Sequence, residues 1–115
     1  MAVEFSPRTA TLNGQTLSVV HVTEQFSVPL EEVRSAELLA ALPKYSRTVG
    51  TGMSSLCEGS FQVKGYGGCR VTFDPRQASF IILKTEDATY IFNLESPQET
   101  KACYDRIQEG NDGNE

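Results

Sequence analysis

The sequence predicts a mainly β domain closed by a C-terminal α-helix, and three observations carry the prediction. Four apolar runs separated by turn residues fill residues 56–94. An Asn-Gly pair at residues 13–14 separates two runs with β-branched residues, which is the strongest short hairpin signal. An amphipathic segment with helix-start residues follows Ser96. A small open barrel, or two near-orthogonal antiparallel sheets plugged by the helix, satisfies this pattern.

The first strands are expected at Thr9–Leu12 and Thr16–Val22, on either side of the Asn-Gly pair. A type I′ turn suits this pair, because both of its central residues need a positive φ. Strand character continues through Phe26 and Val28 and stops at Pro29.

Residues 30–42 allow two interpretations. Leu30, Val33 and the apolar run 38–42 contain good helix formers, and Pro29 stands at a plausible first helical position. The same residues also allow a short edge strand from Val33 to Leu38, followed by a turn that ends at Pro43.

Five further strands are expected at 47–53, 56–63, 68–73, 79–85 and 89–94. The strand Ser79–Thr85 is apolar at consecutive positions, so it is expected to lie centrally or to be covered on both faces. Lys64-Gly65-Tyr66-Gly67 reads as a turn in which glycines supply positive φ. A phosphate-binding loop would need a helix to follow, and a strand follows instead.

The last element is expected to be a helix from Ser96 to about Glu109. Ser96 is the N-cap, Pro97 the first helical residue and Glu99 the partner of a capping box. Thr100, Cys103 and Ile107 lie on one face and predict an apolar stripe. Gly110 is expected to end the helix. We therefore predict one domain over residues 1–110 and a disordered acidic tail over 111–115.

Charge and cysteine content limit the binding partners and the cellular location that can be expected. The net charge is −5, which disfavours non-specific binding to nucleic acid or to anionic lipid. Cys57, Cys69 and Cys103 are widely spaced and odd in number, which indicates free thiols in a reducing compartment. Together with an N-terminus that has neither a basic nor an apolar signal region, this predicts a cytoplasmic location.

Several segments, taken in order, resemble bacterial pleckstrin-homology-like (PH-like) domains over roughly residues 29–107. They are Arg47–Gly52, Gly59–Phe61, Gly65–Gly67, Ile81–Thr85, Tyr90–Asn93 and Ser96–Pro97. The resemblance implies about seven strands in two near-orthogonal sheets that form a PH-like barrel closed by the C-terminal helix. It therefore favours a strand over Val33–Leu38. It also implies a module without catalytic activity.

No motif indicates an enzyme or a cofactor. His21 is the only histidine, and its neighbours form no catalytic pattern. The cysteine spacing lacks a paired histidine, so no metal site is expected. The paired acids at residues 31–32 and 86–87 are typical of solvated turns.

We interpret the chain as a soluble, non-enzymatic module for protein–protein interaction or self-assembly. A small-molecule or lipid-headgroup binding domain, using the open end of the barrel, is the alternative. The candidate partner surface comprises Val20, His21, Tyr45 and Tyr66. Val20 and His21 are included in this surface because the segment Thr16–Val22 carries no formal charge. If the segment lies on a sheet edge, it could pair with a second subunit.

The chain is predicted not to bind phosphoinositide vesicles at physiological salt. PH domains that bind phosphoinositides use lysines and arginines in the first hairpin loop, and residues 12–15 contain none. Vesicle flotation measures this directly. Saturable binding that depends on the phosphoinositide headgroup would contradict the prediction.

Overall fold

A computed structural model of the chain describes most of the backbone. The described residues are 9–13, 15–21, 23–42, 44–52, 57–86, 88–94 and 96–112. Within these residues no helix has the length and apolar character that a membrane crossing requires.

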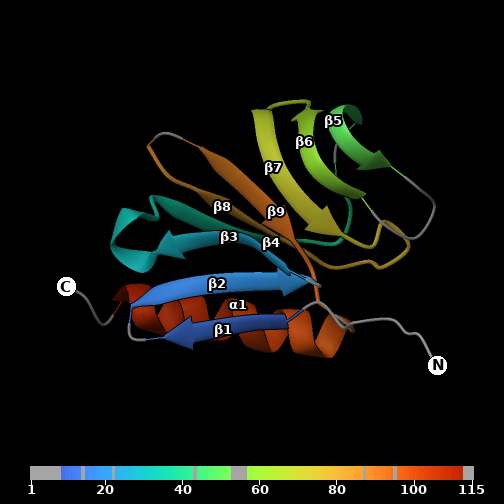
Figure 1. The fold of residues 1–115 in the computed structure, drawn as a ribbon. Helices are drawn as coiled ribbons and strands as arrows, with labels where there is room; N and C mark the ends of the chain where they lie inside the picture. The colour runs from blue at the N-terminus through green and yellow to red at the C-terminus, as the bar shows by residue number, and fades with distance from the viewer. Residues whose placement is uncertain are drawn as a thin grey trace.

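The first three strands form a sheet of their own, the three-stranded sheet (Figure 1). It consists of β1 (Thr9–Asn13), β2 (Thr16–His21) and β3 (Thr23–Pro29), in that order and antiparallel. The expected hairpin between the first two strands is confirmed, because Asn13 pairs with Thr16 and Leu12 with Leu17. The register between β2 and β3 shifts at Val19 and Val20.

The remaining strands form a six-stranded sheet, followed by the helix. Its elements are the 3-10 turn η1 (Leu30–Glu32), β4 (Ser35–Leu39), β5 (Tyr45–Gly52), β6 (Cys57–Val63), β7 (Gly67–Phe73), β8 (Phe80–Lys84), β9 (Thr89–Phe92) and α1 (Pro97–Asp112). The strand order is β4-β8-β9-β7-β6-β5. In Figure 1, β5, β6 and β7 stand on the opposite side of the molecule from α1.

Two expectations about the sheets need correction. The described residues form nine strands rather than about seven, and the six-stranded sheet is open, because no pairing joins its end strands β4 and β5. The sheets therefore do not close into a barrel. One pair is parallel rather than antiparallel: β7 and β9 run together, with Val71 opposite Ile91.

The parallel pair arises because the chain leaves β7, passes the position that β9 later takes, and forms β8 first. Strand β9 then returns antiparallel to β8 and so runs parallel to β7. Asn93 fixes this crossing, and its side chain is fully buried. Its Oδ1 accepts a hydrogen bond from the Asp74 N–H (2.9 Å), and its Nδ2 donates to the carbonyls of Asp74 (3.0 Å) and Ser79 (3.2 Å). A buried amide with these partners ties both ends of the 74–79 connection to the end of β9.

The ambiguous segment 30–42 is a short 3-10 turn followed by strand β4. Pairing with β8 decides this outcome: Ser35 lies opposite Lys84, and the Arg34 N–H donates to the Lys84 carbonyl (2.6 Å). Tertiary hydrogen bonds to a buried strand therefore outweigh the local helix propensity. Helix α1 contacts β4, η1 and β8.

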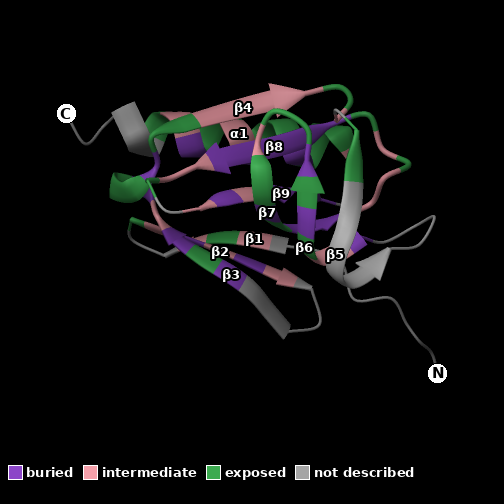
Figure 2. Ribbon diagram, turned by 90° about the horizontal axis from the view of Figure 1, so that it is seen from above, coloured by how far each residue is buried: buried purple, intermediate pink, exposed green. Residues whose placement is uncertain are grey.

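Strand β8 contributes to two apolar clusters, one on each face of the six-stranded sheet, and it is buried almost along its whole length (Figure 2). Ile81 and Leu83 join the first cluster, with β2, β3 and α1. Phe80 and Ile82 join the second cluster, with β6, β7 and β9. The expected central position of this strand is confirmed.

Helix α1 begins as the sequence predicts and ends later. The Glu99 N–H donates to the Ser96 Oγ (3.2 Å), which is the expected N-cap bond. The Thr100 hydroxyl donates to the Ser96 carbonyl (2.9 Å) and accepts from the Leu94 N–H (2.9 Å). The helix continues to Asp112 instead of stopping at Gly110. Of the expected tail, residues 113–115 lie outside the described residues.

The substitution Ile107→Ala is expected to lower the free energy of unfolding by about 2–4 kcal/mol. Ile107 is fully buried in the first cluster, so truncation leaves a cavity under the helix. Urea denaturation measures the loss. Exposed Glu109 on the same helix is the matched control, and Glu109→Ala should change the value by under ~0.5 kcal/mol. Equal effects of the two substitutions would contradict the packing of α1.

Candidate functional site

Two of the four predicted surface residues lie on a strand that cannot accept a partner strand. Val20 and His21 belong to β2, which is paired with β1 on one edge and with β3 on the other. The expectation that Thr16–Val22 could form a sheet edge is therefore wrong, because strand order is set by tertiary pairing. The Val20 side chain is half-buried, and the His21 side chain lies outside the described side chains.

Tyr45 and Tyr66, the other two predicted residues, lie at the same end of the six-stranded sheet. Tyr45 begins β5 opposite Val63 of β6. Tyr66 lies in the turn after β6, where its N–H donates to the Val63 carbonyl (2.9 Å). The expected turn glycines are confirmed, with φ of 90° at Gly65 and 77° at Gly67.

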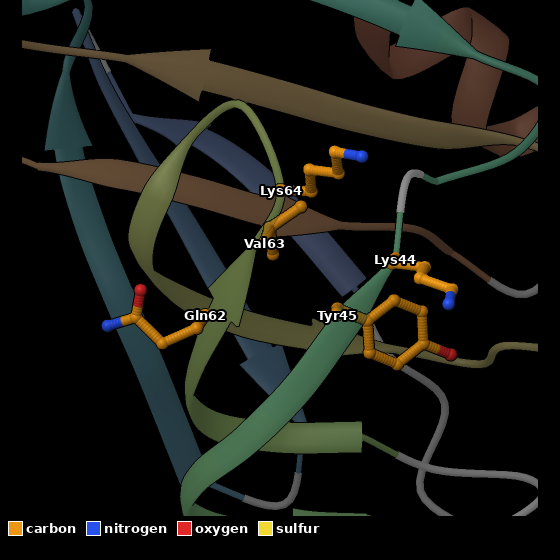
Figure 3. A pocket seen from close by; sticks show the side chains of 5 residues that line it. All are labelled: Lys44, Tyr45, Gln62, Val63 and Lys64. Atoms are coloured by element: carbon orange, nitrogen blue, oxygen red, sulfur yellow. The ribbon is translucent and has the colours of Figure 1, made fainter.

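A shallow hollow of about 380 Å³ lies beside Tyr45. It is lined by Lys44, Tyr45, Gln62, Val63 and Lys64. In Figure 3, the side chains of Lys44, Tyr45 and Lys64 lie to the right of the view, whereas that of Gln62 points to the left. The Lys64 N–H donates to the Lys44 carbonyl (2.8 Å), so the two lysines start from adjacent backbone positions.

The ring of Tyr45 ends a row of aromatic side chains. Its centroid lies 5.9 Å from that of Phe61 and 5.6 Å from that of Phe73, which in turn lies 5.4 Å from Phe80. These contacts hold the ring in place. Tyr45 is nonetheless 39% exposed, and no other large hydrophobic residue in the described part of the chain is exposed. Burial of its inner part raises the pKa of the Tyr45 hydroxyl, and neighbouring Cys57 adds to the rise.

The backbone of Tyr45 faces the open edge of the sheet. In an antiparallel ladder, residues paired without mutual hydrogen bonds direct their N–H and C=O groups away from each other. The bond from the Lys64 N–H to the Lys44 carbonyl places Tyr45 and Val63 in such a pair. Because β5 is the last strand of the sheet, the polar groups of Tyr45 point outward from the edge.

The hollow is positive, although the chain as a whole is negative. Lys44 and Lys64 line it, and none of its lining residues is an acid. Three other bases have acidic partners: Arg34 pairs with Glu86 (3.5 Å), Arg76 with Asp74 (2.9 Å) and Lys101 with Asp105 (3.0 Å). Among the described residues neither lysine of the hollow forms an ion pair. The hollow is thus suited to hold an anionic group.

Tyr66 is fixed by two charged neighbours at the rim of the second cluster. Its hydroxyl donates to the Glu37 Oε1 (2.7 Å), and the Lys84 Nζ lies 5.3 Å from its ring centroid. The hydrogen bond to Glu37, followed by burial and the charge of Glu37, raises the pKa of Tyr66 to about 12. Tyr66 is therefore a neutral hydrogen-bond donor at physiological pH, held beside the hollow rather than lining it.

The thiols are placed as small core residues. Cys57, Cys69 and Cys103 are free and buried. Burial raises the pKa of Cys69 and of Cys103 to about 11, so both remain protonated thiols and are poor nucleophiles. Within the described residues no three His, Cys, Asp or Glu side chains gather as a metal site would require.

Sequence reasoning missed Lys44, Gln62 and Lys64. The two lysines are separated by the whole of β5 and β6, and only the pairing of these strands brings them together. The sequence does contain one local feature that could have indicated these lysines. Each lies directly beside the end of a strand, next to an aromatic residue or a turn.

The comparisons with known proteins gave one match. A family model described as "Bacterial PH domain" matches residues 8–108. The comparison with curated proteins and the comparison with solved structures gave no match. The matched range includes both sheets and most of α1. It confirms the resemblance drawn from the sequence motifs and extends it through the N-terminal hairpin.

Alkaline titration is expected to single out Tyr66 among the four tyrosines. Its pKa is about 12 in the folded chain and about 10 in an unfolded one. The hydrogen bond to Glu37 therefore stabilises the fold fully below pH ~10 and is lost as the pH rises towards ~12. Absorbance at a tyrosinate wavelength follows the ionisation.

The Tyr66→Phe variant should lack the latest-ionising tyrosine while keeping the remaining titration curve. If wild type and variant differ only by a group that titrates near pH ~10, the hydrogen bond between Tyr66 and Glu37 does not form in solution.

Proposed function

The chain belongs to the bacterial PH domain family, and on this basis we propose that it is a non-catalytic module that binds another protein through the outer edge of β5. Fold alone does not give a function, so the proposal depends on the site. The observation that carries it is Tyr45, which combines an exposed, well-packed ring with outward-facing backbone groups.

Strand addition needs an open edge and a side-chain anchor. Main-chain hydrogen bonds to the edge supply affinity, and neighbouring pockets supply specificity. The outward N–H and C=O of Tyr45 meet the first need. Its ring meets the second, because tyrosine is enriched among residues that dominate binding energy. The aromatic row behind the ring keeps it rigid, so little conformational entropy is lost when a partner binds.

A small-molecule site is the second candidate, favoured by the two lysines that line the hollow. Small-molecule sites usually enclose most of the ligand surface. This hollow is open and shallow, which suits a single side chain of a larger partner better. The free, buried thiols fit the cytoplasmic location expected from the sequence.

Selection from a random dodecapeptide library tests the proposal, with wild-type protein as the bait. Selected peptides should be rich in β-forming residues, and Tyr45→Ser should weaken their binding about 10-fold or more, as loss of an aromatic anchor does. The matched control is Tyr104→Ser on α1, on the side of the molecule away from β5. Circular dichroism checks that both variants fold.

Peptides that bind the Tyr45→Ser variant as tightly as wild type would contradict the proposal. So would a selection in which no peptide is enriched over an empty support.

A further inference from the structure

The β5 edge also carries information about the chemistry of its partner. Resting on the proposed function, we propose that the partner is an acidic extended segment, with a carboxylate that lies between Lys44 and Lys64. The two lysines line one hollow without any acid beside them, while the chain has a net charge of −5.

The arrangement of the two lysines favours an anion between them. Their backbones are joined by the 2.8 Å hydrogen bond from the Lys64 N–H to the Lys44 carbonyl. Lys44 directly precedes β5 and Lys64 directly follows β6, so both side chains start at the same end of this strand pair. A carboxylate bound between the two ammonium groups would be attracted by both. The chain as a whole carries 15 acids and 10 bases, whereas the hollow is lined by two lysines and no acid, so an acidic partner meets a favourable local field there.

The hollow also sets the spacing within the partner. Lys44, Lys64 and Tyr45 line the same hollow (Figure 3), so the partner side chains that enter it must come from one face of the added strand. Side chains on one face of an added strand are two positions apart. The partner segment should therefore place an acidic residue two positions from an apolar residue, so that the carboxylate meets the lysines while the apolar group covers Tyr45.

A membrane surface fits these observations less well. Membrane-binding polybasic segments carry about 4–8 clustered bases, whereas two line this hollow. Three bases elsewhere in the chain, Arg34, Arg76 and Lys101, are ion-paired with neighbouring acids. Nucleic acid is disfavoured on the same ground, since its binding requires many phosphate contacts.

Three peptides test the inference by titration against isotope-labelled protein, with amide chemical shifts as the readout. They are TETVTV, its neutral analogue TQTVTV, and ETTVTV, in which the glutamate and the first valine no longer share a face. TETVTV should bind about 5-fold or more tightly than either of the others at low salt, as an ion pair of this kind provides. Near 1 M salt, where the Debye length is about 3 Å, the advantage should fall below ~2-fold.

The double variant Lys44→Gln, Lys64→Gln should remove the preference for TETVTV over TQTVTV. Lys101→Gln, on α1 and paired with Asp105, is the matched control and should preserve it. When TETVTV is added to the wild-type protein, the amide chemical shifts of Tyr45 and Lys64 should change, which would locate the bound peptide at the β5 edge.

Each contrary result has a distinct meaning. If TETVTV and TQTVTV bind equally well and Tyr45→Ser weakens both, the proposal of an acidic partner is wrong. The proposal that the β5 edge binds a protein is then retained. Binding that maps elsewhere, or absence of binding by all three peptides, overturns both proposals. Binding to vesicles with about 30% anionic lipid that the double variant abolishes, without peptide binding, would assign the lysines to a membrane instead.

Discussion

The structure depends on one strand that is apolar at four consecutive positions. Successive side chains of a strand point to opposite faces, so β8 must be covered on both sides. Ile81 and Leu83 are covered by the three-stranded sheet and α1, and Phe80 and Ile82 by the β6, β7 and β9 part of the second cluster. Both clusters are thus tied to the same strand, and either would be incomplete without it.

This requirement leads to the candidate site. The second cluster covers its face of β8 with aromatic side chains, and their row runs outward from Phe80 through Phe73 to Tyr45. Strand β5 is the last strand of this open sheet, and its first residue is Tyr45, whose ring ends the aromatic row. The same apolar packing that stabilises the core therefore holds the exposed anchor and presents the edge.

Local signals in the sequence predicted local structure well. The hairpin at Asn13 and the helix start at Ser96 follow from residues a few positions apart, as does the turn at Gly65. Residues 30–42 could not be resolved this way, because their strand depends on hydrogen bonds to β8. The parallel pairing of β7 and β9, and the wrong edge assigned to Val20, likewise reflect strand order, which is a tertiary property. The hollow was missed for the same reason.

The central claim is that the Tyr45 backbone stands at a free sheet edge, and amide hydrogen exchange of the unliganded protein tests it directly. The Tyr45 amide should exchange like an unpaired one, while the amides of Ile81 and Leu83, paired inside the sheet, should be protected at least ~10³-fold more. Protection of the Tyr45 amide equal to that of β8 would mean that another segment or a second copy already covers the edge, and would contradict the account.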